Sequence, residues 1–300
     1  MDENWDYLII LDACRFDYFS KYYGNYLQGK LDKVYSVASC TPEWCKKSFK
    51  EYYGDVVYVS GNPYINSRTQ VGGFLGKNHF SKIIDVWEWA WDDKIGTVRP
   101  ENITEAAIDC RKKYSEKRLI IHYLQPHSPY LNYDFQAGFS KPNVETGKVL
   151  TDLQNIKTDN IVEKTVDYFS SWAYKWGFFN SNPSWKIREL LNLNPKTPMD
   201  AIRRKLGNSG LQHAYICNLK LVLFQVNKLV QNLSGKIIIT ADHGELLGEG
   251  NNYSHPYGSS NSLLREVPWF TITTRKENTK SMEKNMIIQK VKQLKSKVRL

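Results

Sequence analysis

Carboxylate and imidazole side chains stand at the ends of apolar runs in this sequence, where together they would suit a divalent metal. Asp12 directly follows one run, and Asp242 and His243 follow another. Thr41, within the polar stretch SVASCTPEWCKK, adds a hydroxyl oxygen. Three oxygen ligands and one imidazole nitrogen suit Zn²⁺ or Mn²⁺, whereas Mg²⁺ accepts an imidazole less readily. We therefore predict one divalent metal, held by Asp12, Thr41, Asp242 and His243.

A metal at this position would make Thr41 reactive. A threonine hydroxyl is a weak nucleophile by itself, but contact with a divalent ion lowers its pKa and yields an alkoxide at neutral pH. Thr41 is therefore the candidate nucleophile. Two further histidines, His127 and His255, lie in polar segments at or beyond the ends of apolar runs and join the candidate site.

Each of these residues also has a purely structural explanation. An aspartate that follows a strand is commonly a helix N-cap, and Asp12 before ACRFDYF would then do nothing more. The segment ADHGE would likewise be a loop with a cap and a turn. An aspartate, an Asp-His pair and two further histidines at the polar ends of separate runs are harder to explain as caps, which favours a site.

Four short apolar segments that turn polar at their ends are typical of buried strands. They lie within Tyr7–Leu11, Asp55–Pro63, Arg118–Tyr130 and Gly235–Glu245. Between them, residues 101–117 and 214–233 repeat apolar side chains every three or four positions, as helices do. This alternation predicts an α/β fold with a mostly parallel central sheet flanked by helices. In such sheets ligands bind beyond the carboxyl ends of the strands, where the polar residues collect.

Two segments depart from this alternation. Residues 132–210 are rich in Asn, Lys, Thr and Trp and lack strand-like runs, which predicts a helical insertion or lid over the site. Residues 275–300 are rich in lysine with spaced apolar positions, which predicts a basic C-terminal helix that packs on the domain or contacts a membrane surface. We interpret residues 1–300 as one catalytic domain that carries this insertion and this tail.

The charge of the chain restricts its partners. A formal net charge of +10 favours an anionic partner, such as a phosphate or sulfate ester, an acidic polymer, a membrane surface or nucleic acid. The chain lacks a recognisable nucleic-acid-binding motif, so nucleic acid is the least expected of these. The tryptophans of VWEWAWDD (Val86–Asp93) are mixed with acids, which favours a packing segment or a carbohydrate-facing wall over a polyanion platform.

The cysteines and the hydropathy pattern predict a cytosolic protein. Five cysteines, an odd number without a CxxC pair, are typical of free thiols in a reducing compartment. The sequence after Met1, DENWD, does not resemble a signal peptide. No apolar run approaches the roughly 20 residues that cross a bilayer.

Several of these segments resemble the sulfatase-like branch of the alkaline phosphatase superfamily. LIILDACRFD is similar to the opening strand with its metal-ligating acid, SCTPEW to the nucleophile loop, and YLQPHSPY to the PHxPY segment of sulfatases. IIITADHGELLGEGNNYSHPYG resembles the DHGExLGE...H signature of phosphoethanolamine transferases and lipoteichoic acid synthases, and REVPWF resembles the strand that usually follows. The matches span residues 7–73 and 119–270 in the expected order, with the insertion and the tail unmatched.

The resemblance implies a role for each matching residue. The metal-ligand positions of the family fall on Asp12, Asp242 and His243, and Thr41 falls on the nucleophile that bridges the metal. His255 matches a histidine that contacts the substrate's phosphate.

Two further residues are candidates for contact with the substrate. His127 matches a substrate-contacting histidine of the sulfatases, and either His127 or His255 could protonate a leaving group. Arg15, about one helical turn after Asp12, would steady an anionic ester or serve only at the surface.

The sequence also departs from the sulfatase pattern. Cys40 stands where sulfatases convert a cysteine to formylglycine within C-x-P-S-R, but Glu43 and Trp44 replace the serine and arginine. Sulfatases usually have an asparagine that holds Ca²⁺ at the position of His243, and the imidazole suits a transition metal better. Members with two metals commonly carry an Asp-x-x-x-His spacing that is missing here. We predict one metal, although the histidines (His127, His213, His255) leave room for a second.

The sequence therefore predicts a metal-dependent hydrolase or transferase that acts on phosphate esters or diesters through a threonine nucleophile. The first alternative is a sulfatase that uses Cys40 as formylglycine with Ca²⁺. The second is a non-catalytic module that binds polyanions. The expected substrate is an anionic small molecule, glycolipid or polymer ester, and the basic tail would allow peripheral membrane contact.

Overall fold

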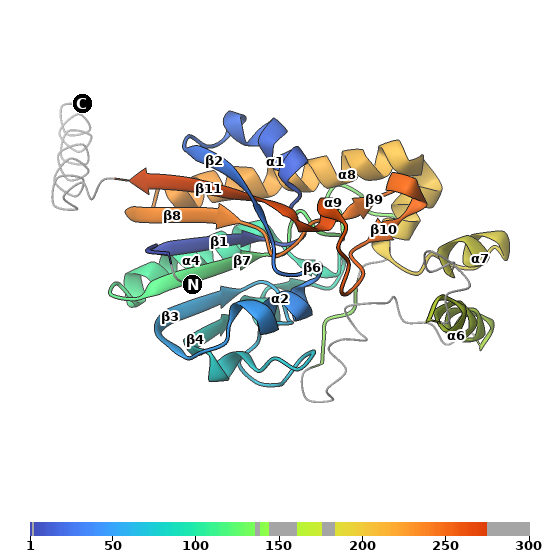
Figure 1. Ribbon diagram of the computed structural model, residues 1–300, viewed down its shortest axis with the longest axis horizontal. Helices are drawn as coiled ribbons and strands as arrows, with labels where there is room; N and C mark the ends of the chain where they lie inside the picture. Colours follow the sequence, from blue (N-terminus) through green and yellow to red (C-terminus); the bar gives the residue numbers. More distant parts are fainter. Residues whose placement is uncertain (2, 136–138, 144–160, 176–183, 275–300) are drawn as a thin grey trace, which may run out of the picture.

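Seven strands form one central sheet in the computed structural model of the chain, which describes residues 1, 3–135, 139–143, 161–175 and 184–274 (Figure 1). The strands are β1 (Tyr7–Leu11), β2 (Lys30–Tyr35), β3 (Tyr53–Ser60), β4 (Phe80–Asp85), β7 (Arg118–Tyr123), β8 (Gly235–Thr240) and β11 (Glu266–Thr274). Their order is β2-β11-β8-β1-β7-β3-β4, and only the pairs that include β11 are antiparallel. The predicted mostly parallel α/β sheet is confirmed.

Strand β1 lies at the centre of the sheet, with three strands on each side, and both of its faces are covered. All five of its residues are buried, and such a strand needs a continuous apolar sequence rather than an alternating one. In its register Leu11 pairs with Tyr123 of β7, and Ile10 pairs with Thr240 of β8. The residues that follow these strands therefore leave the sheet at the same edge.

Helices cover both faces of the sheet. The helices of the described residues are α1 (Phe16–Tyr22), α2 (Thr41–Ser48), α3 (Val86–Trp89), α4 (Pro100–Lys113), α6 (Ile161–Lys175), α7 (Ser184–Leu190), α8 (Pro198–Val230) and α9 (Ser262–Arg265). Alternate residues of β1 point to opposite faces. Ile9 packs in one apolar cluster with residues of α1, α4 and α8, whereas Ile10 packs in another with Trp44 and Cys45 of α2.

Of residues 132–210, for which a helical insertion is predicted, the structure describes α6, α7 and the first part of α8. A buried ion pair, Arg188 Nη2 to Glu163 Oε2 at 2.6 Å, joins α7 to α6. The boundary predicted at residue 210 falls inside α8, in which Gly207 interrupts the helical geometry with φ 69° and ψ −174°. Figure 1 places α6 and α7 at the end of the molecule opposite the N-terminus, near two short strands, β9 (Leu246–Leu247) and β10 (Tyr253–Ser254).

The sequence prediction missed β2 and β4. Both lie at edges of the sheet, and their sequences, KLDKVY and FSKIID, mix charged and apolar residues because one side faces solvent. The basic helix predicted for residues 275–300 lies outside the described residues. Within the described residues, no helix has the length and apolar character needed to cross a membrane.

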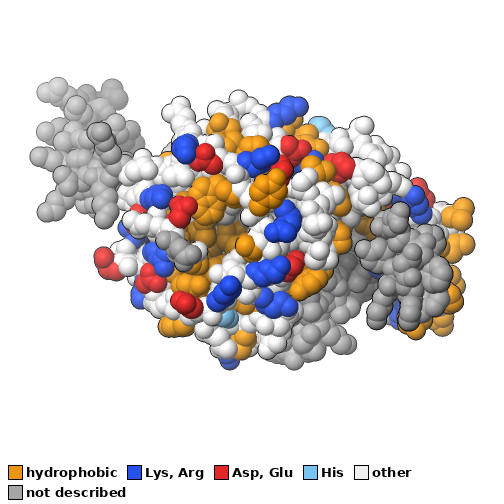
Figure 2. All heavy atoms as spheres, viewed as in Figure 1, with side chains coloured by type: hydrophobic (Ala, Val, Ile, Leu, Met, Phe, Trp, Pro, Cys, Tyr) orange, Lys and Arg blue, Asp and Glu red, His pale blue; other side chains and the backbone are white. Residues whose placement is uncertain are grey.

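On the face shown in Figure 2, basic and acidic side chains are interspersed around apolar ones rather than gathered in one basic patch. All five cysteines are free thiols, and four of them are buried.

Candidate active site

A cavity of about 340 Å³ lies at the carboxyl edge of the parallel strands. Five of the residues singled out in the sequence line it, namely Asp12, Cys40, Thr41, His127 and His255. They come from the loop after β1, the start of α2, the loop after β7 and the loop after β10. The edge of the sheet that was expected to carry the site therefore carries a cavity.

The acid and imidazole groups converge on the hydroxyl of Thr41. Thr41 Oγ1 donates a hydrogen bond to Asp242 Oδ2 at 2.7 Å and lies 3.3 Å from His243 Nε2. His243 Nε2 in turn lies 3.7 Å from Asp12 Oδ1. All four side chains are buried. The structure thus brings together the four residues that the sequence prediction named as metal ligands.

The loops that follow β1 and β8 fix the carboxylate of Asp242. Its Oδ1 accepts hydrogen bonds from the backbone N–H groups of Ala13 at 3.1 Å and His243 at 2.9 Å. Ala13 reaches this position in a left-handed conformation, φ 59°, which is uncommon for a residue with a side chain and typical of functional loops. Asp242 Oδ2 is then left to face Thr41.

The orientation of His243 also follows from its loop. Its Nδ1 lies 2.8 Å from the carbonyl oxygen of Gly244, so Nδ1 carries the proton and the lone pair of Nε2 faces Thr41. Gly244 is required there, because a Cβ at this position would lie 2.1 Å from the carbonyl oxygen of Leu263. The glycine of ADHGE thus lets the loop pass close to α9.

Two buried residues that the sequence prediction missed complete this group. Asn62 Nδ2 donates to Asp12 Oδ2 at 2.6 Å, and His122 Nε2 lies 4.0 Å from the same oxygen. The other nitrogen of His122, Nδ1, lies 2.8 Å from the hydroxyl of Tyr58. Asn62 follows β3, so the strand-end rule could have found it. His122 sits inside an apolar strand, where a lone polar residue was the only signal.

Burial and charge repulsion make this group suit a cation. Burial, together with the charges of Asp242 and Glu245, raises the pKa of Asp12 well above its ordinary value. Burial lowers the pKa of His243 well below its ordinary value, and that of His122 to about 4, so both imidazoles are neutral and able to bind a metal. Among the described residues, Asp12 Oδ1 and His122 Nε2 have no hydrogen-bond partner. The donor set fits a divalent ion.

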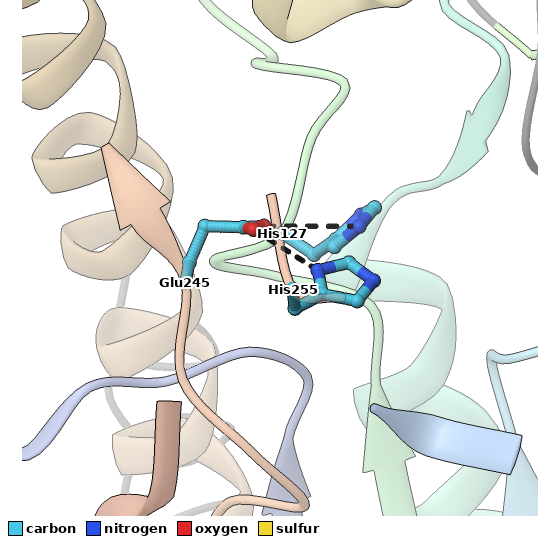
Figure 3. A group of neighbouring side chains, drawn as sticks. All are labelled: His127, Glu245 and His255. Atoms are coloured by element: carbon cyan, nitrogen blue, oxygen red, sulfur yellow. Dashed lines mark hydrogen bonds and ion pairs between the residues drawn. The ribbon is translucent and has the colours of Figure 1, made fainter. Parts of the chain in front are cut away.

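Figure 3 shows a second group, in which His127 and His255 both point toward Glu245. His255 Nδ1 lies 2.9 Å from Glu245 Oε1, and His127 Nε2 lies 3.9 Å from Glu245 Oε2. The His255 ring is also near His243, with 4.4 Å between ring centroids. This geometry allows either proton transfer or a second metal. Glu245 lies within ADHGE, but the sequence prediction assigned it no role.

The partners of this group set its protonation. Burial opposes the charge on His255, but the Glu245 carboxylate outweighs it, so the pKa of His255 is raised. Burial dominates at His127 and lowers its pKa. At Glu245, burial is outweighed by the attraction of the histidines, chiefly His255, so its pKa is lowered. His255 therefore holds a proton more readily than His127 does.

Arg15 does not reach the cavity wall that the structure describes. Its guanidinium binds Asp17, with Nη2 to Oδ2 at 2.7 Å, and also Glu249 and the carbonyl oxygen of Glu245 at 3.2 Å. The residue is only 4% exposed, so the alternative of a surface role is wrong. Arg15 ties the loop after Glu245 to the start of α1. Its role in binding substrate stays a prediction.

The residues that depart from the sulfatase motif have structural partners. Glu43 accepts hydrogen bonds from the backbone N–H groups of Ser39 and Gly258, each at 3.3 Å, and pairs with Lys47 at 2.7 Å. Trp44 is buried against Phe49, with 5.0 Å between ring centroids. These contacts hold the loop that carries Thr41.

Cys40 lines the cavity beside Thr41, but its environment disfavours a thiolate. Burial raises the pKa of its thiol to about 11. Of the two neighbours, Thr41 alone makes hydrogen bonds to Asp242 and His243 among the described residues. His213, the remaining histidine considered for a second metal, contacts the hydroxyl of Tyr133 at 3.1 Å and is not part of the cavity wall.

Comparisons with known proteins identify the fold. No protein-family model matches the sequence, and no curated protein matches it either. Among solved structures, the chain is similar to the C-terminal periplasmic domain of EcEptC from Escherichia coli in complex with zinc, with a TM-score of 0.51 and 11% identity over 91% of this chain and 74% of that one.

Two further structures are similar at lower scores. The periplasmic domain of phosphoethanolamine transferase EptC from Campylobacter jejuni has a TM-score of 0.43 and 14% identity over 89% of this chain and 78% of that one. The phosphonate monoester hydrolase SpPMH from Silicibacter pomeroyi has a TM-score of 0.44 and 13% identity over 89% of this chain and 67% of that one.

Metal binding is expected to stabilise the folded chain. The four candidate metal ligands come together only in the folded chain. Zn²⁺ or Mn²⁺ at a free concentration one hundred times its dissociation constant should therefore add about 2.7 kcal/mol to the free energy of unfolding. Thermal unfolding with and without EDTA measures this shift. Asp242→Asn should abolish the shift, whereas Asp109→Asn, whose side chain is 77% exposed, should keep it. If neither metal raises the midpoint of thermal unfolding of the parent chain, the assignment of a metal site is contradicted.

Asn218 of α8 is expected to stabilise the loop that carries His127. Its Nδ2 donates to the carbonyl oxygens of His127 and Pro129, both at 3.0 Å, and its Oδ1 accepts from Leu131 N at 2.9 Å. Asn218→Ala leaves buried backbone groups unpaired and should lower the free energy of unfolding by about 2 kcal/mol. Urea unfolding measures this loss, and the same change at exposed Asn232 should cost less than about 0.5 kcal/mol. Equal losses for the two variants would rule out the loop contact.

Proposed function

We propose that this chain, which has the fold of the sulfatase-like alkaline phosphatase superfamily, is a metal-dependent enzyme that acts on phosphate esters or diesters through Thr41. One observation carries the proposal, namely the placement of the Thr41 hydroxyl 2.7 Å from Asp242 and 3.3 Å from His243 at the wall of a cavity. The zinc complex of EcEptC, which shares the fold, supports the choice of metal.

Asp12, Thr41, Asp242 and His243 would hold one divalent metal, with Zn²⁺ or Mn²⁺ preferred for the imidazole. Once bound, the metal would lower the pKa of Thr41 and neutralise charge on the phosphate oxygens. Asp242 orients the Thr41 oxygen by accepting its hydrogen bond. Asn62 holds the carboxylate of Asp12 in place from the other side.

The reaction would proceed in two displacements at phosphorus. In the first, Thr41 Oγ1 gives its proton to Asp242 Oδ2 and forms a bond to phosphorus as the bond to the leaving oxygen breaks, and the leaving oxygen takes a proton from His255. Glu245 keeps His255 charged and oriented through Nδ1, so Nε2 is the nitrogen that gives the proton. In the second, water or an acceptor hydroxyl attacks phosphorus and gives its proton to His255, while the released Thr41 oxygen takes its proton back from Asp242.

A sulfatase with formylglycine at Cys40 and Ca²⁺ is the second candidate function. Cys40 lies in the cavity wall, which is the observation in its favour. Thr41 holds the contacts that a nucleophile needs, and His243 is a poor ligand for Ca²⁺.

Interspersed charges on the viewed face give little support to a polyanion-binding module (Figure 2). We keep a cytosolic location as part of the proposal, on the five free thiols.

Replacement of Thr41 distinguishes these functions. Thr41→Ala should reduce metal-dependent hydrolysis of methyl p-nitrophenyl phosphate by about a thousandfold or more, because the nucleophile is lost. Thr41→Ser should retain most of the activity, and Cys40→Ala should change it little. Steady-state kinetics of the metal-loaded variants provide the measurement. The mechanism is wrong if the Thr41→Ala protein keeps full activity while the Cys40→Ala protein loses it.

Replacement of His255 tests the proton donor. His255→Gln should slow the release of an alkyl alcohol by about a hundredfold or more, because an alkoxide leaves poorly without a proton. Release of p-nitrophenolate, which needs no proton, should change much less. His213→Gln serves as the control, since His213 lies outside the cavity wall. Equal losses with both leaving groups would exclude His255 as the acid.

A further inference from the structure

The tryptophan-rich segment Val86–Asp93 contributes one ring to the cavity, and the proposed reaction gives that ring no task. Trp87 is 1% exposed, and its indole N–H donates to Asp85 at 3.2 Å, so it is a packing residue. Trp89 is 64% exposed. Trp91 lines the cavity that also contains Thr41. The three tryptophans thus occupy three environments, and Trp91 is the one placed to contact a substrate.

A short hairpin holds Trp91 in register with the catalytic edge. Strands β5 (Trp91–Asp92) and β6 (Thr97–Val98) pair antiparallel, and Gly96 makes the turn with φ 78°. The carbonyl oxygen of Val98 accepts a hydrogen bond from Gln125 Nε2 at 2.9 Å, in the loop that leads to His127. The position of the indole is therefore coupled to the loop of a candidate catalytic residue.

The indole N–H of Trp91 is a donor that needs an acceptor. Its Nε1 is buried and has no hydrogen-bond partner among the residues that the structure describes. Buried indole N–H groups usually find a partner, since an unpaired buried donor is unfavourable. Rotation of this half-buried ring toward the cavity would bring the donor to an oxygen atom of a ligand.

The rest of the cavity wall combines flat rings with hydroxyl groups. The rings belong to Tyr64, Phe139, Trp185 and Tyr257, and the hydroxyls to Thr97, Ser128, Thr197 and Ser254. Trp185 of α7 is itself held by stacking on Tyr253, with 5.0 Å between centroids and an interplanar angle of 28°. An alkyl chain would use the rings alone, whereas a sugar presents both a C–H face and several hydroxyl groups.

The volume of the cavity limits the size of the ligand. About 340 Å³ is near the lower end of the range of roughly 300 to 1,000 Å³ found for small-ligand sites. This space accommodates a phosphoryl group with one ring-sized substituent. A longer chain would extend out of the cavity.

We propose that the cavity binds a hexose ring carried on the phosphodiester substrate, with Trp91 as a specificity-determining residue. Trp91 donates its indole N–H to a sugar oxygen, and the other rings of the wall pack against the C–H face of the sugar. The inference rests on the proposed function, because the hexose is one substituent of the diester that Thr41 attacks. It narrows the substrate class to hexosyl phosphodiesters.

Two p-nitrophenyl diesters test this proposal with the metal-loaded enzyme. One carries a methyl group and the other a glucose attached through its 6-oxygen, so the leaving group is the same. The parent chain should prefer the glucosyl diester in kcat/KM by about tenfold or more, which corresponds to about 1.4 kcal/mol. Trp91→Ala should remove this preference, Trp91→Phe should reduce it by keeping the ring without the N–H, and Trp89→Ala should leave it unchanged.

A cyclohexylmethyl diester separates a sugar from any apolar ring. A preference for it equal to that for the glucosyl diester, or a glucosyl preference that survives Trp91→Ala, overturns the proposal. The methyl diester reports on the proposed function independently, since its turnover requires no sugar contact. If none of the diesters is turned over, calorimetric binding of methyl glucose-6-phosphate diester to the parent chain and the Trp91→Ala chain decides. Equal affinities would again overturn the proposal.

A further experiment distinguishes a hexose carried on a lipid from a hexose carried on a soluble molecule. The glucosyl phosphodiester is presented either free in solution or as the headgroup of a lipid in neutral phosphatidylcholine vesicles. Faster turnover in vesicles indicates a glycolipid, and faster turnover in solution indicates a soluble sugar. Trp91→Ala should slow both by a similar factor, and a factor near one in both arms contradicts the role of Trp91.

Discussion

Three buried carboxylates at one edge of the sheet set the main constraint on this structure. Asp12, Asp242 and Glu245 are each no more than 3% exposed, and like charges in such a medium repel strongly. Each is stabilised by a different means. Asp242 accepts two backbone N–H groups, Glu245 pairs with His255, and Asp12 receives one amide from Asn62 while its other oxygen has no partner among the described residues. The imbalance at Asp12 is the feature that a divalent cation would correct.

The loops around these carboxylates are shaped by the same need. Ala13 takes a left-handed conformation so that its N–H reaches Asp242, and Gly244 has no space for a side chain beside α9. Arg15 is used within the scaffold, where its guanidinium anchors the loop after Glu245. The strained backbone of Ala13 and the buried guanidinium of Arg15 both help to hold the edge of the sheet rigid. Such rigidity is expected where reacting groups must be held in place before a substrate binds.

The sequence predicted the parts of the site that follow from local pattern. Asp12, Asp242 and His243 stand directly after short apolar runs, so their place at the edge of a parallel sheet could be inferred without coordinates. The edge strands β2 and β4 were not predicted, because their apolar residues are mixed with charged ones. Asn62 also follows a strand and could have been inferred in the same way, whereas His122 and Glu245 became candidates only through contacts between distant segments, such as the 2.9 Å contact from His255 Nδ1 to Glu245 Oε1. No local pattern encodes that Arg15 finds a partner in Glu249, more than two hundred residues away.

The cavity has two walls of different origin. Asp12, Thr41 and Glu245 come from loops at the edge of the central sheet, whose register is fixed by buried strands. Trp91 and Trp185 come from a two-stranded hairpin and a short helix, outside the segments that resemble the sulfatase-like family. The first wall can change little without disturbing the core, because Asp12 and Glu245 follow the buried strands β1 and β8, and Thr41 begins α2, whose Trp44 and Cys45 pack in the core. The second is attached through a few hydrogen bonds and one stacked pair, so its rings can vary while the chemistry at Thr41 stays the same. Under the proposed function, the sheet would determine the reaction, and the hairpin and α7 would determine which ester reaches it.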